Sequence, residues 1–95
     1  MRKETIVHIT FSSRFNAQLS DAPHEIIEAF LATLQLFRDD QHHPMLRNHQ
    51  LRKKLAGYRS IDVTENWRAV FKEARSEEQI VIIFHLIGTH PELYG

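Results

Sequence analysis

Two histidines, an arginine and a tyrosine in the second half of the chain carry the most informative chemistry. His49 lies in a polar basic stretch, Arg68 lies in an alternating apolar segment, and His90 and Tyr94 stand four residues apart near the C-terminus. Imidazole, with an ordinary pKa near ~6.5, can take or give a proton at neutral pH. Arginine presents a fixed cationic fork that matches phosphate oxygens. Together these groups are suited to handling a phosphodiester.

Cleavage of RNA needs few protein groups, because the 2′-hydroxyl of the RNA is the nucleophile. The protein must supply a base for the hydroxyl proton, an acid for the leaving 5′-oxygen, and cations for the charge on phosphorus. His49 and His90 are candidates for proton transfer and Arg68 for charge stabilisation. Tyr94 is a candidate for stacking on an unpaired base, worth roughly 1–3 kcal/mol. No Ser-His-Asp spacing, Gly-rich phosphate loop or carboxylate pair offers a competing chemistry.

The sequence offers no convincing metal site. The chain has seven His and no Cys, which excludes disulfides and thiolate ligation. His42, His43 and His49 lie close in sequence, but no spaced carboxylate accompanies them. His8 and His85 fall in apolar segments, where packing is the simpler explanation. We therefore expect no metal and no small-molecule cofactor.

Charge is unevenly distributed along a chain whose formal net charge is zero. Between Leu46 and Arg75, eight Lys or Arg stand against three Asp or Glu. This predicts a basic face suited to RNA, with a simply solvated surface as the alternative. The cations that we expect to bind RNA are Arg52, Lys53, Lys54, Arg59 and Lys72. No apolar run approaches the ~20 residues of a membrane span, and the N-terminus lacks a signal-peptide core, so we expect a cytoplasmic protein with no membrane partner.

Length and periodicity predict one domain, residues 1–95, of the α+β class. Apolar spacing indicates a strand over residues 4–11, a short helix after Ser12, and a longer helix from about Asp21 to Arg38. Three further strands are predicted, at Tyr58–Val63, Trp67–Lys72 and Gln79–Leu86. The expected fold is a small, mostly antiparallel four-stranded sheet with two N-terminal helices on one face, in the order β-α-α-β-β-β.

Alternation within the strands predicts which side chains face the helices. Trp67, Ala69 and Phe71 form one set, which should pack on the helices and leave Arg68 on the opposite, exposed face. The last strand is apolar on both faces, which favours a central position in the sheet. Gly88 is expected to release the backbone after that strand. Residues 39–56 show no clean period and form a long connection.

The run from His49 to Tyr94 resembles the RelE/ParE superfamily of bacterial toxins, and within it most closely the YafQ-type messenger-RNA interferases. The match covers about half the chain. The segments that carry it are His49-Gln50-Leu51, Gly57-Tyr58-Arg59, Val63, Asn66-Trp67, Gly88-Thr89-His90 and Leu93-Tyr94-Gly95.

This resemblance implies a toxin of a type II toxin–antitoxin system. Such toxins cut messenger RNA, usually at the ribosomal A site, and are silenced by a cognate antitoxin. Messenger RNA, the ribosome and an antitoxin are therefore the expected partners. His49 and His90 match catalytic histidines of the YafQ type, and Trp67 matches an active-site position. Tyr94 stands where an aromatic residue closes the site, and Arg68 matches the catalytic arginine of the RelE branch.

Three positions depart from the YafQ pattern. Asp62 stands where that type has a histidine, Asn66 where it has an aspartate, and Leu86 where it has an arginine on the last strand. Asp62, which we count with Trp67 among the RNA-binding candidates, either orients a histidine or ends a strand. A catalytically weakened, antitoxin-binding member is one alternative, motivated by Leu86. A ParE-like inhibitor of DNA gyrase, which does not need the His and Tyr set, is another.

Overall fold

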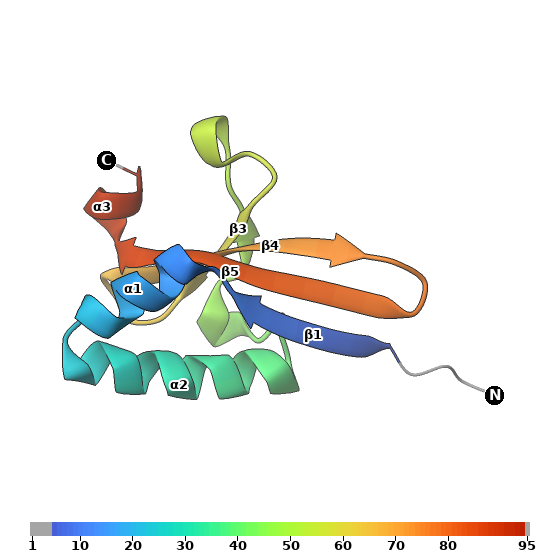
Figure 1. The fold of residues 1–95 in the computed structure, drawn as a ribbon, viewed down its shortest axis with the longest axis horizontal. Helices are drawn as coiled ribbons and strands as arrows, with labels where there is room; N and C mark the ends of the chain where they lie inside the picture. Colours follow the sequence, from blue (N-terminus) through green and yellow to red (C-terminus); the bar gives the residue numbers. More distant parts are fainter. Residues whose placement is uncertain (1–4, 95) are drawn as a thin grey trace.

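A five-stranded sheet forms the centre of the computed structural model, which describes residues 5–94 (Figure 1). Its strands lie in the order β1-β5-β4-β3-β2. Only β1 runs parallel to its neighbour β5, and the other pairs are antiparallel. The bounds are β1 (Ile6–Phe11), β2 (His49–Gln50), β3 (Arg59–Asp62), β4 (Trp67–Arg75) and β5 (Gln79–Thr89).

The α+β class is confirmed, whereas the expected four-stranded sheet is wrong in strand number. The additional strand, β2, has two residues and pairs with β3 at the edge of the sheet. A segment this short has no periodicity that a sequence can reveal. The central position of β5, between β1 and β4, agrees with its predicted burial on both faces.

Two helices, α1 (Ser13–Asp21) and α2 (His24–Asp39), cover one face of the sheet (Figure 1). Ser12 caps α1, because its Oγ accepts a hydrogen bond of 2.9 Å from the backbone N–H of Phe15. Pro23 immediately precedes α2, where its missing N–H costs nothing. The core between the helices and the sheet contains Phe15, Phe30, Phe37, Phe71 and Phe84, whose rings contact one another.

A register shift in the β4–β5 pair decides which residues of β5 face the helices. Phe71 pairs with Phe84, but Val70 pairs with Leu86, so that His85 is the extra residue. Beyond this bulge Ile87 joins the core cluster in place of Leu86. Leu86 therefore lies on the face opposite the helices, where it is 9% exposed.

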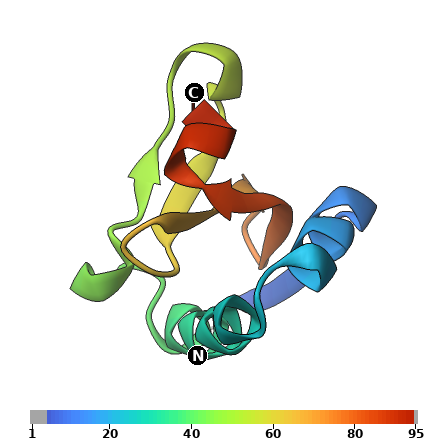
Figure 2. The ribbon, with the colours of Figure 1, turned by 90° about the vertical axis from the view of Figure 1, so that its left-hand side faces the viewer.

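The face opposite the helices is partly covered by the connection between α2 and β3 and by the C-terminal helix α3 (His90–Tyr94) (Figure 2). The connection contains two short 3₁₀ turns, η1 (Pro44–Leu46) and η2 (Lys53–Leu55). Leu46 anchors it in the core. None of the helices within residues 5–94 is long and apolar enough to cross a membrane.

Gly88 does not release the backbone after the last strand, as the sequence suggested, but lies within β5 and pairs with Arg68. A Cβ at Gly88 would lie 3.4 Å from Cδ2 of Leu93 and 3.6 Å from Cβ of Glu92. These are ordinary van der Waals distances, so a side-chain methyl would be tolerated at this position and the close approach of α3 does not require a glycine.

Candidate active site

One cavity of about 510 Å³ brings together all four residues that the sequence predicts for catalysis. It is open to solvent and lies on the side of the sheet opposite the core helices. Three separate parts of the chain contribute to it: the connection before β3, the paired ends of β3 and β4, and α3. Its lining residues are Arg47, Asn48, His49, Asp62, Arg68, His90 and Tyr94.

His49 has a fixed tautomer. Its Nδ1 lies 2.7 Å from the backbone carbonyl oxygen of Arg47. A carbonyl can only accept, so Nδ1 donates, and in the neutral ring Nε2 keeps its lone pair. The side chain is exposed at the edge of the sheet. This arrangement suits a general base.

His90 and Tyr94 are placed by α3. The imidazole of His90 contacts the ring of Tyr94 edge to face, with 4.7 Å between the ring centroids. The Tyr94 hydroxyl donates a hydrogen bond of 2.7 Å to the hydroxyl of Ser60 on β3. The ring nitrogens of His90 make no hydrogen bond with residues 5–94, which leaves them available to a ligand.

A capping box begins α3, and it is an element that the sequence interpretation missed. The backbone N–H and the hydroxyl of Thr89 donate to the Glu92 carboxylate at 2.9 and 2.7 Å, and the N–H of Glu92 lies 3.4 Å from Oγ1 of Thr89. The signal was present as Thr89-His90-Pro91-Glu92, a Thr followed three residues later by a Glu. The side-chain and backbone hydrogen bonds from Thr89 lower the pKa of Glu92.

We expect Glu92→Ala to fray α3 and to separate the rings of His90 and Tyr94. Lowering the pH should do the same to the wild-type protein. The pKa of Glu92 is lowered in the folded state, so the cap contributes fully above its unfolded pKa and is lost as pH falls through the folded one. Nuclear Overhauser contacts between the two rings measure this. Glu77→Ala, at an exposed glutamate in the β4–β5 turn, is the control and should leave those contacts intact.

Arg68 lies on the predicted face, but it is not freely exposed. Its Nε lies 2.9 Å from Oδ1 of Asp62, and both side chains are only 16% exposed. Its Nη1 donates to the backbone carbonyls of Thr64, Glu65 and Trp67 at 2.8, 2.8 and 3.2 Å. Nη2 has no partner among residues 5–94. The Arg68 guanidinium is thus held rigidly, and its Nη2 remains available to a ligand.

Asp62 is the last residue of β3, so it ends a strand, as one of the two expectations had it, but it bonds to no histidine among residues 5–94. It pairs directly opposite Arg68 in the β3–β4 register and forms an ion pair with it. Its second oxygen lies 3.8 Å from Nε of Arg47. A carboxylate between two guanidinium groups holds them in place and repels phosphate, so its expected contribution is to position Arg68 and Arg47.

Arg47 and Asn48 line the cavity but were not among the predicted site residues. The Arg47 side chain is 76% exposed, and its backbone adopts a left-handed conformation with φ of 50°. Asn48 donates to the backbone carbonyl of Gln41 at 3.0 Å and accepts from Nε of Arg59 at 2.7 Å. Neither position has a sequence signal, because no motif marks an arginine that must adopt a positive φ.

Three of the predicted RNA-binding residues lie away from this cavity. Trp67 packs against the core and lines a groove beside α1, because alternation in β4 turns it away from Arg68. Arg59 donates from Nε to Oδ1 of Asn48 and lines a different cavity. The ammonium of Lys72 lies 5.6 Å from the centroid of the Tyr58 ring, farther along the open face.

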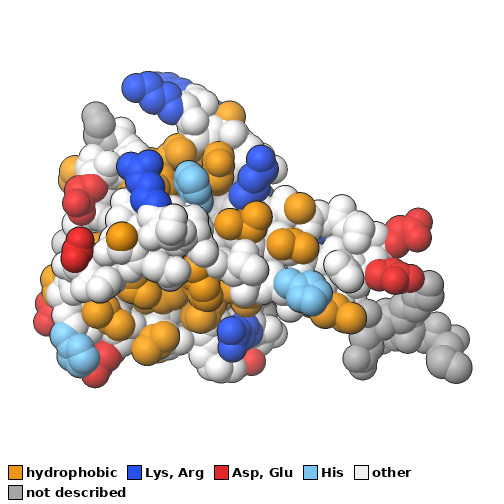
Figure 3. Space-filling model, in the orientation of Figure 1, with side chains coloured by type: hydrophobic (Ala, Val, Ile, Leu, Met, Phe, Trp, Pro, Cys, Tyr) orange, Lys and Arg blue, Asp and Glu red, His pale blue; other side chains and the backbone are white. Residues whose placement is uncertain are grey.

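Arg52, Lys53 and Lys54 lie on the loop that contains η2, and they border a second cavity that shares Tyr94 with the first. Lys and Arg side chains are visible over this loop at the top of Figure 3. Leu86, the position at which the motif resemblance predicts an arginine, supplies no cation on β5. A replacement would be Arg68 on β4 or a cation of the loops.

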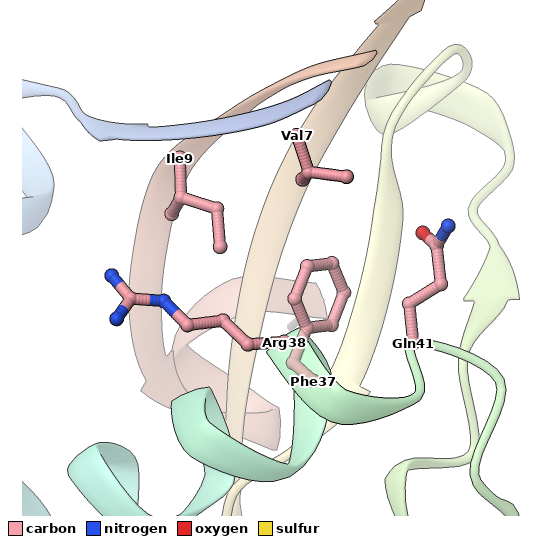
Figure 4. Close-up of a pocket in the computed structure, with 5 residues that line it drawn as sticks. All are labelled: Val7, Ile9, Phe37, Arg38 and Gln41. Atoms are coloured by element: carbon pink, nitrogen blue, oxygen red, sulfur yellow. The ribbon is translucent and has the colours of Figure 1, made fainter. Parts of the chain in front are cut away.

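A further cavity, of about 330 Å³, lies between β1 and the end of α2 (Figure 4). Val7, Ile9 and Phe37 form its apolar walls, and Arg38 and Gln41 stand at its rim. It contains no imidazole or carboxylate, so it lacks the groups for proton transfer. The first cavity is the better candidate for an active site.

Comparison with solved structures identifies the fold, although the sequence matches no protein-family model and no curated protein. The YoeB/ParE toxin from Agrobacterium tumefaciens superposes with a TM-score of 0.70 at 13% identity, over 87% of this chain and 98% of that one. The chain has the fold of these toxins. YafQ from E. coli BL21(DE3) gives a TM-score of 0.66 at 21% identity, over 92% of this chain and 97% of that one.

The same RelE/ParE toxin fold occurs in the RelBE2 toxin–antitoxin complex from Mycobacterium tuberculosis. The TM-score there is 0.64 at 20% identity, over 95% of this chain and 98% of that one. The resemblance predicted from the motifs is confirmed at the level of the fold. The roles of the residues around the cavity stay predictions.

Proposed function

We propose that this chain is the toxin of a type II toxin–antitoxin system and cuts ribosome-bound messenger RNA. The observation that carries the proposal is the convergence of two imidazoles and two guanidinium groups on one open cavity. Phosphodiester cleavage by 2′-hydroxyl attack needs these groups and no protein nucleophile. The shared fold with YafQ and RelE-type toxins supports the proposal.

His49 acts as the general base and His90 as the general acid. Nε2 of His49 takes the proton from the 2′-hydroxyl, whose oxygen then forms a bond to phosphorus. The bond from phosphorus to the 5′-oxygen breaks, and protonated His90 gives its proton to that oxygen. The products are a 2′,3′-cyclic phosphate and a free 5′-hydroxyl. The assignment follows from the tautomer of His49, which the Arg47 carbonyl fixes.

Arg68 and Arg47 supply the positive charge that the transition state requires. Arg68 is fixed by Asp62 and the turn carbonyls, and it offers Nη2 without reorganisation. Arg47 is exposed at the rim, and its two terminal nitrogens have no partner among residues 5–94. We assign to Arg47 the role of the arginine that Leu86 replaces on β5. The two positive charges of Arg47 and Arg68 and the negative charge of Asp62 leave the cavity with one net positive charge from these groups.

Tyr94 positions the RNA and does not carry a proton. Its hydroxyl already donates to Ser60, so its ring is held while one face remains available for stacking on a base. A target on the ribosome places the protein in the cytoplasm. Its other partner is a cognate antitoxin, as in the RelBE2 complex. The basic cavity rim and loop favour an acidic or amphipathic antitoxin segment.

We expect induction of the wild-type gene to arrest growth and to leave cut transcripts, mapped by primer extension. On programmed ribosomes, a message with a single 2′-deoxynucleotide at the cut position should stay intact there, because it lacks the nucleophile. The matched all-ribose message is the control. Intact transcripts together with broken or relaxed DNA would support gyrase inhibition instead. Cleavage of the 2′-deoxy message would contradict the proposed mechanism.

A further inference from the structure

The second cavity beside Tyr94, of about 390 Å³, has a chemical character different from the first. Its apolar walls come from Leu55, Leu93 and Tyr94, and it contains no histidine. It lies between the loop of residues 51–58 and α3, which stand side by side above the sheet (Figure 1 and Figure 2). We propose that it binds the base of a nucleotide next to the scissile phosphate. This inference rests on the proposed function in taking RNA as the ligand.

Tyr94 is the physical link between the two cavities, because its side chain lines both. A strand of RNA whose phosphate occupies the cavity of His49 and His90 therefore has a neighbouring base within reach of the apolar walls. Aromatic and aliphatic side chains gain from covering a base that has left its stack. The bond from Tyr94 to Ser60 keeps the wall in place before RNA arrives.

The rim of the second cavity is strongly cationic. Arg52, Lys53 and Lys54 are exposed and form no ion pair with residues 5–94. Three adjacent unpaired cations beside an apolar slot match a nucleotide, which joins an apolar base to an anionic phosphate. A purely apolar partner would not require them.

The loop that carries these cations is built into a defined shape. The backbone N–H of Leu51 donates to the carbonyl of Tyr58 at 2.9 Å and closes the loop. Within it Lys53 and Gly57 adopt positive φ angles of 58° and 92°. Such conformations are restrictive for a lysine. The loop is thus shaped in advance to present its side chains beside α3.

Two polar groups of α3 that could read a base edge are engaged within the protein. The Glu92 carboxylate accepts two bonds from Thr89, and the Tyr94 hydroxyl donates to Ser60. Discrimination among bases needs such donors and acceptors in fixed positions. Arg52, Lys53 and Lys54 make no side-chain bond with residues 5–94 that would fix their positions, so the cavity is expected to hold any base mainly by stacking, with little preference.

The test uses the intact protein and a 2′-O-methylated RNA pentanucleotide, which lacks the nucleophile and cannot be cut. Oligonucleotides with one abasic position each are compared with the complete one, in the wild type and in Leu55→Ser. We expect one abasic position to weaken binding to the wild type by about 5- to 150-fold, the loss of one stacked base. In Leu55→Ser that loss should largely disappear. Leu31→Ser, at a leucine 57% exposed on α2, is the control and should behave as wild type.

Methyl NMR of the wild-type protein gives a second measurement that does not depend on a variant. The complete oligonucleotide should shift the Leu55 and Leu93 methyl signals, and the critical abasic one should not. Absence of these shifts at millimolar oligonucleotide, or an abasic loss of equal size in Leu55→Ser and wild type, would overturn the proposal. Shifts without any cleavage on ribosomes would support the base site and contradict the nuclease. Cleavage on ribosomes without these methyl shifts would support the nuclease and contradict the base site.

Discussion

His49→Ala and His90→Ala should each slow single-turnover cleavage on programmed ribosomes by about 10²- to 10⁴-fold, the usual contribution of one positioned acid or base. The two variants should differ in pH dependence. A base must be deprotonated to act, so the rate rises with pH on the acidic limb, and His49→Ala should flatten that limb. An acid must be protonated, so the rate falls on the alkaline limb, and His90→Ala should flatten that one.

His24→Ala provides a matched control for both variants. His24 is an exposed imidazole on α2 that lies 3.1 Å from Glu28, on the opposite side of the sheet from the cavity. Its loss should leave both the rate and the pH profile unchanged. Equal slowing by His49→Ala and His90→Ala with both limbs preserved would mean that the imidazoles hold RNA and do not transfer protons. If His49→Ala flattened the alkaline limb and His90→Ala the acidic limb, His49 would be the acid and His90 the base.

The features of the fold that follow from periodicity could be predicted, and those that depend on a single irregular residue could not. The helix after Ser12 begins where its cap placed it, whereas the longer helix begins at His24 and the Asp21 predicted to start it is the last residue of α1. The side chains of β4 alternate as expected. The bulge at His85 interrupts the alternation of β5. Nothing in the run Phe84-His85-Leu86 distinguishes a bulge from a regular strand, since bulges are set by pairing with β4.

The candidate site shows the same division. His49, Arg68, His90 and Tyr94 could be singled out by residue type and motif, and the structure brings them to one cavity. The Asp62–Arg68 pair could not be foreseen without the strand register, which places the two residues opposite each other. The role suggested for Trp67 by motif conflicted with its role by alternation. Alternation determined its side-chain direction, because packing the large apolar ring of Trp67 against the core, where it is half-buried, is favourable.

Arg68→Ala should reduce the rate of cleavage by about 10²- to 10³-fold, the cost of removing one preorganised stabilising group. It should also lower the free energy of unfolding by about 1–3 kcal/mol, because Asp62 and the turn carbonyls lose their partner. Arg68→Lys should be nearly as slow. A single ammonium cannot bind Asp62 and the carbonyls of Thr64 and Glu65 while a third nitrogen faces the phosphate.

Asp62→Asn tests whether Asp62 positions Arg68, separately from the charge that Arg68 itself supplies. The substitution keeps the Arg68 side chain but neutralises the carboxylate that fixes it, and it adds one net positive charge to the cavity, so RNA binding should tighten and KM should fall. The freed guanidinium is no longer fixed for the transition state, so kcat should fall as well. Arg75→Ala is the matched control for Arg68→Ala, since Arg75 also lies on β4 and pairs with a carboxylate, Glu73, at 3.3 Å, but at the exposed far end of the strand. If Arg68→Ala stayed folded and cut at the wild-type rate, Arg68 would only brace the β3–β4 turn, and Arg47 would carry the catalytic charge alone.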